Sequence, residues 1–367
     1  MPLGEVLQIP ELSRLVSRSL SQKDTLQIAI ASRRFFHLFI PLLWETIHGA
    51  TRLFILIEGT RTNRQSANIF SDRACEIIVR GIGGCTSYGC LIVPTPQVLP
   101  EVVNEQTLAR IRFYGAFVKF LTVFEDNRTT CSLMNWQALW IQTRDQALLP
   151  NLVSCILFND DFMSFSQLPW LTLFISPVLQ ELRVKSMDGV PPPYTSPRTC
   201  YSVLRILIEN KADLHILAIF PDEGMKPGGT DAPAPNYQSS FSQCKETNNF
   251  RSFLQHTKLL TSLSTTKFML LQDDVLGLVS GSTILESLNI CQGASPGDLP
   301  IAALSSEAFP ALKHLGLLHF FTDTTIQDFY KTLPGVINKL TSLEIQYHNR
   351  HPNKRQSISS FISLICH

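Results

Sequence analysis

The residue groups that could do chemistry in this chain are all incomplete. His348 and His351 stand close together in a basic loop, but no neighbouring cysteine or histidine completes a zinc site. The glycine run at 81–84 precedes no phosphate-binding lysine and is typical of a flexible turn. The acidic pairs at 160–161 and 273–274 stand where turns or helices begin, so we expect them to cap helices rather than to transfer protons. These groups predict no metal and no other cofactor.

Longer catalytic and nucleotide-binding signatures lead to the same expectation. The sequence holds no G-x-x-x-x-G-K-[ST] phosphate loop, no G-x-G-x-x-G fingerprint and no H-E-x-x-H zinc motif. Nine cysteines are present without a C-x-x-C pair, and neither Cys200 nor the others carry the local signature of a nucleophile. A disulfide framework is therefore not expected, and the sequence favours a protein that is not an enzyme.

Charge and hydropathy narrow the class of partner. The chain has 31 Lys and Arg against 30 Asp and Glu, so net charge gives no reason to expect a nucleic acid or an anionic membrane. Only 17% of residues are charged and the mean hydropathy is +0.10, which fits either an unusually large core or an apolar surface covered by a partner. No uncharged apolar run reaches about 18 residues and no secretory leader is visible. These absences favour an intracellular protein of the cytoplasm, the nucleus or both.

The N-terminal residues predict several short helices. Pro10 suits the first position of a helix that runs to about Leu20, because its missing N–H is not needed there. Ser21 and Asp24 form an S-x-x-D start for a second helix. We expect Pro41 to interrupt that second helix, with short helical pieces following in PLLWETI and ATRLFILIEG.

Three further segments look like connections or ends rather than core. Residues 59–112 are rich in turn formers and predict a connector with a loop insertion, ending in a helix near 104–111. Residues 221–240 hold four prolines and three glycines and predict a flexible insertion. The chain ends in SISSFISLICH, which looks like the start of another unit, so either the product is short or a further unit is missing.

From residue 113 onward an L-x-x-L-x-L pattern recurs. Alternate apolar residues of a short strand point inward, and the following segment packs behind them. The middle residues of the last three copies lie 27 and 28 residues apart, within the period of about 20–29 residues of leucine-rich repeats. The clear copies are Val118-Leu121-Val123, Leu179-Leu182-Val184, Leu285-Leu288-Ile290, Leu312-Leu315-Leu317 and Leu340-Leu343-Ile345. Looser copies are expected in PNLVSCILF, YSVLRILIE and LLTSLSTTKFML, and helices behind the strands at 136–148, 273–279 and 325–333.

Together these patterns predict a fold class of mixed α and β. A small N-terminal helical module is expected at 1–58 and the connector at 59–112. An irregular α/β leucine-rich-repeat-like solenoid is expected at 113–367, with the flexible insertion at 221–240 inside it.

The stretch IPELSRLVSRSLSQKDTLQIAIASRRFFHLFIPLLW, from Ile9 to Trp44, resembles the F-box in the variant common in fungal proteins. In those proteins the F-box precedes irregular leucine-rich repeats, and the rest of this chain resembles them loosely. The most specific piece is PLLW after SRRFF. Many F-boxes differ by one more residue between the proline and the acidic residue, and by Val-Cys where this chain has Ala31-Ser32.

The resemblance implies a role in ubiquitin transfer. F-box helices dock on a Skp adaptor, which is held by a cullin, and the repeats hold a client protein. The chain would then be the substrate-recognition subunit of a Skp–cullin–F-box ubiquitin ligase, with no active site of its own. The residues that would carry the adaptor contact are Ile9, Pro10, Leu12, Leu15, Val16, Leu20, Leu26 and Ile30.

Other hypotheses stay open on the sequence alone. Helical spacing also fits apolar residues that only pack against each other and the repeats. An F-box-like interaction scaffold that recruits no ligase would keep the same helices. An enzyme with an unrecognised site would show a concave pocket that holds titratable groups with shifted pKa values.

Overall fold

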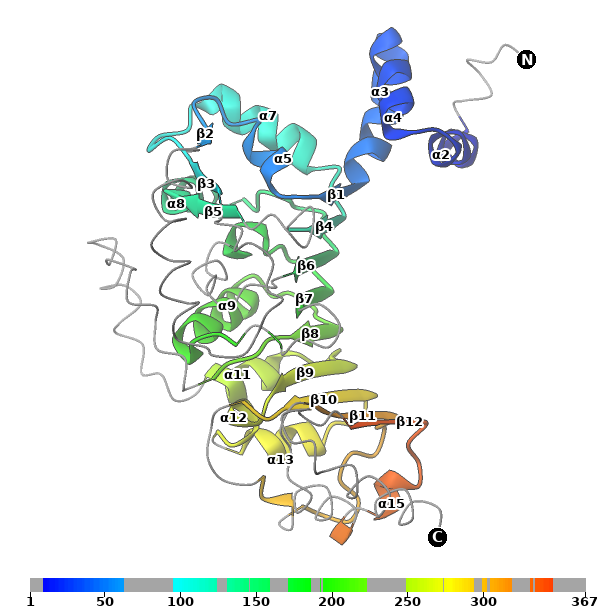
Figure 1. Cartoon of the computed structure of the whole chain (residues 1–367), viewed down its shortest axis with the longest axis vertical. Coiled ribbons are helices and arrows are strands. Elements are labelled where there is room, and N and C mark those ends of the chain that lie inside the picture. Colours follow the sequence, from blue (N-terminus) through cyan, green and yellow to red (C-terminus); the bar gives the residue numbers. More distant parts are fainter. Residues whose placement is uncertain are drawn as a thin grey trace, which may run out of the picture. The chain divides into compact units, whose positions relative to one another are not determined.

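The structure is a computed structural model of the 367-residue chain (Figure 1). Its contacts form two compact units, one of residues 1–181 with 210–212 and one of residues 182–209 with 213–367. The boundaries expected at 58 and 112 stay predictions. The residues that the structure describes are 9–62, 95–123, 131–158 without 145, 171–185, 192, 194–222, 249–293 without 273, 299–318 without 302 and 303, and 331–345 without 333.

The first unit contains the N-terminal helices and two groups of strands. Its helices are α2 (Pro10–Ser19), α3 (Gln22–Ala31), α4 (Arg33–Glu45), α5 (Thr51–Phe54), α7 (Glu105–Gly115) and α8 (Trp136–Thr143). Its larger group of strands is β1 (Thr46–His48), β4 (Phe120–Thr122) and β6 (Ser154–Phe158). A separate three-stranded sheet has the order β2 (Arg61–Thr62), β3 (Thr95–Val98) and β5 (Cys131–Met134). The helices predicted after Pro10, after Ser21 and near 104–111 are thereby confirmed.

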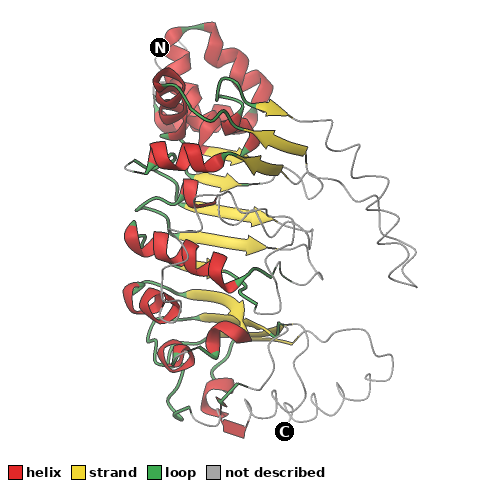
Figure 2. Ribbon diagram, turned by 90° about the vertical axis from the view of Figure 1, so that its left-hand side faces the viewer, coloured by secondary structure: helices red, strands yellow, loops and turns green. Residues whose placement is uncertain are grey.

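The second unit contains the remaining strands and helices, except that Glu181, the first residue of β7, belongs to the first unit. Its strands are β7 (Glu181–Lys185), β8 (Ile216–Ala218), β9 (Ser262–Thr266), β10 (Ser287–Cys291), β11 (His314–Leu318) and β12 (Ser342–Ile345). Its helices are α9 (Pro197–Glu209), α11 (Asn249–His256), α12 (Lys267–Leu270), α13 (Val275–Ser280) and α15 (Pro334–Ile337). The helices of each unit lie to one side of its strands (Figure 2).

The predicted fold class is confirmed at the level of a mixed α/β protein. One sheet has nine strands in the order β1-β4-β6-β7-β8-β9-β10-β11-β12, and the pairs β1–β4, β4–β6 and β8 through β12 are parallel. The helices predicted at 136–148 and 273–279 are present as α8 and α13. Most of 325–333, most of 221–240 and the final segment lie outside the described residues.

The middle residues of the repeated pattern stand side by side in the sheet. In the second unit Leu217 pairs with Leu263, Leu263 with Leu288, Leu288 with Leu315, and Leu315 with Leu343. The first four of these side chains are at most 4% exposed. Because side chains alternate between the two faces of a strand, each copy sends its leucines to the same face. One continuous apolar layer results.

One expected copy of the pattern is placed differently by the structure. The segment YSVLRILIE, expected as a strand, lies in helix α9, where Cys200, Val203, Leu204 and Leu207 form a buried face at helical spacing. The strand of that region is β8, in which Leu217 is fully buried. Pro197 at the start of α9 favours the helix, because its fixed φ suits the first turn. The error came from a spacing of three residues that helices and the repeat pattern share.

The boundaries of the N-terminal helices also differ from expectation. The second helix ends at Ala31, and Ser32 adopts an extended backbone with φ −156° and ψ 154° before α4 begins. Pro41, expected to interrupt a helix, lies inside α4, and PLLWETI is the end of α4 followed by strand β1. A proline removes one hydrogen bond, and the buried side chains of Phe39 and Ile40 hold the helix together around it.

Candidate partner-binding surface of the N-terminal helices

Local hydrogen bonds define where the N-terminal helices start. The Asp24 backbone N–H donates to Ser21 Oγ at 3.1 Å, and the Phe35 N–H donates to Ser32 Oγ at 3.1 Å. These bonds satisfy backbone donors that a helix leaves unpaired in its first turn. Helix α2 has no such side-chain cap and relies on Pro10 in its first turn. The sequence therefore sets the limits of α3 and α4 through two serines.

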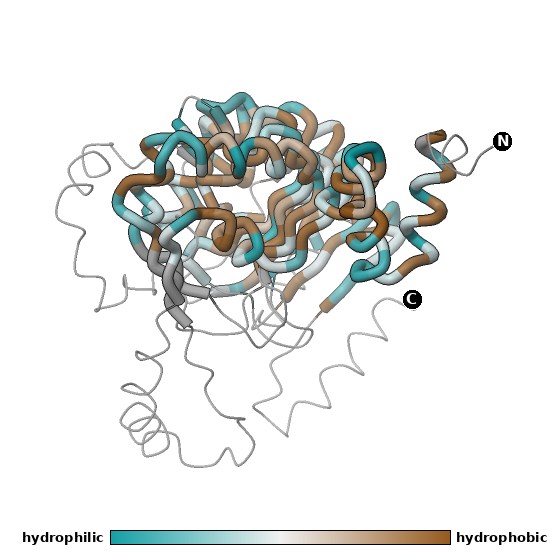
Figure 3. The backbone as a smooth tube through the Cα atoms, turned by 90° about the horizontal axis from the view of Figure 1, so that it is seen from above, coloured by the Kyte–Doolittle hydropathy of each residue, from teal (hydrophilic) through white to brown (hydrophobic). Residues whose placement is uncertain are grey.

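The three helices share a small apolar core. Helices α2 and α3 each pack against α4 (Figure 1). Ala29 and Phe39 are fully buried and Ile40 is 4% exposed. Partly buried side chains pack against these three residues: Val16, Ile28, Phe35, Phe36, Leu38, Leu42, Leu43, Trp44, Tyr114 and Phe117. Apolar stretches therefore run through these helices near the N-terminal label (Figure 3).

Helix α3 buries two small residues, packs Ile28 against the core and exposes two large apolar residues. Its buried residues are Thr25 and Ala29, which lie one turn apart. Leu26 and Ile30, also one turn apart, are 47% and 69% exposed. A helix that only stabilised its own fold would turn the larger apolar side chains inward, because burial free energy grows with apolar area. The outer face of α3 therefore presents two large apolar side chains to solvent.

The other residues predicted for the adaptor contact divide between exposed and half-buried positions. Ile9 and Leu15 are exposed, at 44% and 57%. Leu12, Val16 and Leu20 are half-buried, and Val16 packs against the core. Pro10 opens α2, and its side chain lies outside what the structure describes. The structure thus brings Leu26 and Ile30 together on α3 and places Leu12 and Leu15 one turn apart on α2.

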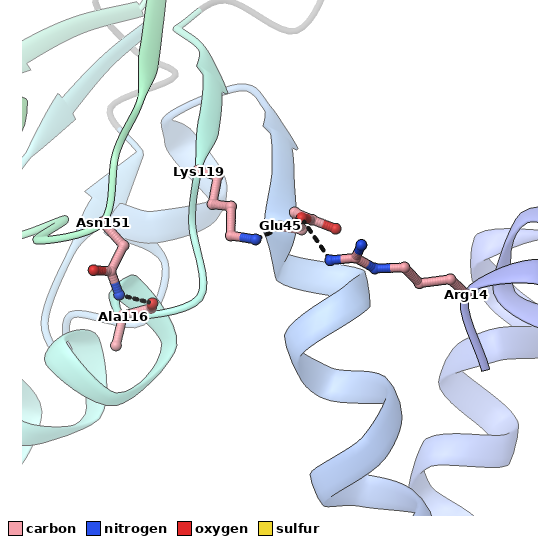
Figure 4. Close-up of polar contacts among 5 residues, drawn as sticks. All are labelled: Arg14, Glu45, Ala116, Lys119 and Asn151. Carbon is pink, nitrogen blue, oxygen red and sulfur yellow. Dashed lines mark hydrogen bonds and ion pairs between the residues drawn. The ribbon is translucent and has the colours of Figure 1, made fainter. Parts of the chain in front are cut away.

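Glu45 ties the helices to the first strands of the sheet. Its Oε1 atom accepts from Arg14 Nη2 at 3.4 Å and from Lys119 Nζ at 2.9 Å (Figure 4). The Lys119 backbone N–H also donates to the Glu45 carbonyl at 2.9 Å. Beside this junction, Asn151 Nδ2 donates to the Ala116 carbonyl at 2.7 Å (Figure 4). Both cations are about half exposed, so these ion pairs orient the elements more than they stabilise them.

An aromatic contact reinforces the same junction. The rings of Trp44 in α4 and Tyr114 in α7 have centroids 4.6 Å apart. Phe113 makes edge-on contacts with Tyr114 and Phe117 at 5.1 and 5.3 Å. Aromatic pairs at these distances add to the burial term. The outer surface of α3 is therefore carried on helices that are fixed to the sheet of the first unit.

The buried cysteines are not activated nucleophiles. Burial raises the pKa of Cys155 from 9.0 to about 12, and the nearby charge of Glu181 adds to the effect. Burial also raises the pKa values of Cys200 and Cys291. These thiols stay protonated at neutral pH, whereas a reactive cysteine is partly exposed and has a lowered pKa.

One match to a nucleophile motif was missed at the level of sequence. The segment GASPG at 293–297 fits the G-x-S-x-G pattern. It follows strand β10, and Gly293 has φ +66° with Asp222 Oδ2 3.0 Å from the place of a Cβ. Burial, followed by the charges of Cys291 and Asp222, raises the pKa of the neighbouring Tyr194. Ser295 lies outside the described residues, so the structure supplies no geometry for a nucleophile.

The remaining motifs receive little structural support. Asp274 starts helix α13 in the left-handed region, at φ 61°, and makes no side-chain capping bond, which corrects the expectation that it caps the helix. The histidine pair, the glycine run and the pair at 160–161 lie outside the described residues. Within the described part of the chain, no group of three or more His, Cys, Asp or Glu side chains could hold a metal ion.

Comparison with known proteins assigns this chain to no family. No family model matches this chain, and no curated protein matches it. None of the helices in the described ranges is long and apolar enough to cross a membrane.

Proposed function

We propose that this chain is the substrate-recognition subunit of a Skp–cullin–F-box ubiquitin ligase. The observation that carries the proposal is the outer face of α3, where Leu26 and Ile30 are exposed while Thr25 and Ala29 are buried. These two large residues belong to the stretch that resembles an F-box. An adaptor that receives apolar anchors at helical spacing would cover them.

The second part of the proposal concerns the repeated strands. We infer that β4 and β6 through β12, with the helices behind them, form an irregular leucine-rich-repeat-like solenoid. The in-register leucines of β8 to β12 support this interpretation, because each copy adds one strand next to the preceding one. The separations of 25, 27 and 28 residues between Leu263, Leu288, Leu315 and Leu343 also fit.

The proposed mechanism is proximity and requires no active site in this chain. The N-terminal helices would hold the adaptor and cullin, while the repeats would hold a client protein. Binding both at once raises the effective concentration of client lysines near a charged conjugating enzyme. The contacts of Glu45 support the first part of this role, because they hold the N-terminal helices against the first strands of the same unit.

The test is calorimetric titration of purified Skp adaptor into the full chain. Wild-type protein should bind with a negative heat-capacity change, which marks apolar burial. A Leu26→Asp/Ile30→Asp variant should lose at least about a hundredfold in affinity, since binding would then bury two charges without partners. Ile55→Asp is the matched control, because Ile55 is 70% exposed and lies outside α2 and α3.

The outcomes of this titration distinguish a ligase subunit from an interaction scaffold that recruits no ligase. All variants must first show the circular dichroism spectrum and unfolding midpoint of the wild type. Equal adaptor affinity in the double variant would show that α3 is not the contact. If the folded wild-type chain does not bind any adaptor, the ligase proposal is wrong, and an F-box-like scaffold becomes the better description.

A further inference from the structure

Cations lie at both ends of the outer face of α3. Arg18 stands in the last turn of α2 and Lys23 in the first turn of α3, ahead of the two exposed apolar residues. Arg33 and Arg34 open α4 directly after the end of α3. All four side chains are exposed. Within the part of the chain that the structure describes, none of the four takes part in an ion pair or a side-chain hydrogen bond.

Lys23 puts one of these charges on the outer face itself. It stands three residues before Leu26 and seven before Ile30, and residues at these spacings share one side of an α-helix. Arg33 and Arg34 follow Ile30 by three and four residues. Because α3 has ten residues that each rise about 1.5 Å, the cations at its two ends are roughly 15 Å apart.

The acidic residues of the same helices leave this charge uncompensated. Helices α2, α3 and α4 contain five Lys and Arg but three acidic residues, Glu11, Asp24 and Glu45. Glu45 already pairs with Arg14 and Lys119 (Figure 4), and the Asp24 carboxylate accepts from the capping serine hydroxyl at 2.6 Å. Glu11 stands in the first turn of α2, at the end away from α3. The chain as a whole is nearly neutral, so the positive excess is local.

The combination of apolar and basic side chains favours an acidic protein surface as the partner. Single-stranded nucleic acid is held by cations together with aromatic rings that stack on its bases, whereas the exposed large side chains of α3 are aliphatic. A helix that lies in an anionic membrane inserts a broad apolar face, whereas α3 exposes two large apolar side chains, Leu26 and Ile30.

We propose that α3 docks into a groove whose floor is apolar and whose two ends carry carboxylates. The floor receives Leu26 and Ile30, and the carboxylates pair with Lys23 at one end and with Arg33 and Arg34 at the other. Such complementary charges speed up the encounter of two proteins and select the right partner more than they add affinity. This inference rests on the proposed function, since it names the chemistry of the partner that covers α3.

The test measures how fast the full chain associates with purified Skp adaptor at two salt concentrations. Salt screens exposed charges, so raising NaCl from about 0.05 M to about 0.5 M should lower the wild-type association rate constant at least about tenfold. In Lys23→Gln/Arg33→Gln/Arg34→Gln the rate constant at low salt should be at least about tenfold below the wild type and should change little with salt. Glutamine keeps the length and the helix propensity of these side chains.

A second triple variant, Arg251→Gln/Lys258→Gln/Lys339→Gln, is the matched control. It removes three exposed cations from other elements and changes the net charge of the chain by the same amount. It should associate with the adaptor like the wild type. Both triple variants must first show the circular dichroism spectrum and unfolding midpoint of the wild type.

A pair of synthetic helical peptides tests the inference without the adaptor. Both peptides carry the same leucines at helical spacing, but one has glutamates at both ends and the other has lysines there. The full chain should bind the glutamate peptide at least about tenfold more tightly than the lysine peptide. The Lys23→Gln/Arg33→Gln/Arg34→Gln variant should lose this preference.

Three results would overturn the inference. These are equal adaptor association by the wild type and the Lys23→Gln/Arg33→Gln/Arg34→Gln variant, no preference of the wild type for the glutamate peptide, and tighter binding to phosphatidylserine vesicles than to that peptide. If the adaptor binds at a rate that salt does not change, this inference fails while the ligase proposal stands. If the adaptor does not bind but the glutamate peptide is preferred, the ligase proposal fails while this inference stands.

Discussion

The side-chain hydroxyl of Ser32 caps helix α4 at its boundary with helix α3. Its backbone is extended, and its Oγ accepts from the Phe35 N–H at 3.1 Å. Ser32→Ala should lower the free energy of unfolding by about 1 kcal/mol, because a capping bond is lost. Urea denaturation of the purified chain measures this change. Ser202→Ala is the control, since Ser202 lies inside α9 and its hydroxyl only donates to the Arg198 carbonyl, so the change should stay within about 0.5 kcal/mol.

Cys155 gives a prediction about pH. Its pKa is raised from 9.0 to about 12 in the folded protein by burial, so between these values the unfolded chain loses a proton that the folded chain retains. Stability is therefore unaffected by this thiol below pH 9.0 and falls as the pH rises toward its folded pKa. Cys155→Ala should make the decline in unfolding free energy between pH 9 and 11 shallower by up to about 1.4 kcal/mol per pH unit. An unchanged slope would show that the thiol is not buried.

At the scale of elements, the first residues of strands β9 and β10 alternate between half-buried and buried positions. Leu288 is fully buried between Leu263 and Leu315, and Ser287 beside it is half-buried on the opposite face of the strand. Leu288→Ala should cost about 2–5 kcal/mol of unfolding free energy, through lost burial and the cavity left behind. Ser287→Ala should change it by less than about 0.5 kcal/mol. Equal costs at the two positions, measured by urea denaturation, would mean that the assigned strand faces are wrong.

The strands of the clear repeat copies were predictable, and the placement of the looser copies was not. Two expected copies are confirmed as strands: Ser154–Phe158 in PNLVSCILF and Ser262–Thr266 in LLTSLSTTKFML. YSVLRILIE lies in helix α9 because its apolar residues also repeat at helical spacing. Strand β1 was missed because its residues directly continue the helical segment PLLWETI. Strand β8 was missed although it carries the copy Leu214-Leu217-Ile219, because the prediction placed the copy of this region in YSVLRILIE.

For the whole molecule, the low share of charged residues and the exposed apolar side chains together predict how soluble the chain is. Only 17% of the residues are charged, and the exposed apolar residues of the described part include Leu15, Leu26 and Ile30. Expressed alone, the chain should be poorly soluble, and co-expression with the Skp adaptor should raise its soluble yield severalfold. The Leu26→Asp/Ile30→Asp variant should be more soluble alone and gain nothing from the adaptor. Equal wild-type yields with and without the adaptor would count against a covered apolar surface.

The amino-acid sequence determined the local features of this protein. Pro10, Ser21 and Asn104 start helices because their conformations and side-chain oxygens suit the first turn. The copy at 285–290 forms strand β10, in which Leu288 and Ile290 are buried and the residues between them are half-buried. All of these depend on neighbours within a few positions of the chain.

Only the tertiary structure decided which faces are free. Spacing could not show that α3 buries Thr25 and Ala29 and exposes Leu26 and Ile30, because the direction of a helix face depends on what packs against it. Nor could it show that Gly316 makes room for Asn289, since these residues become neighbours only through strand register. Contacts between residues far apart in sequence arise when the strands pair. The exposed face of α3 therefore emerged from packing.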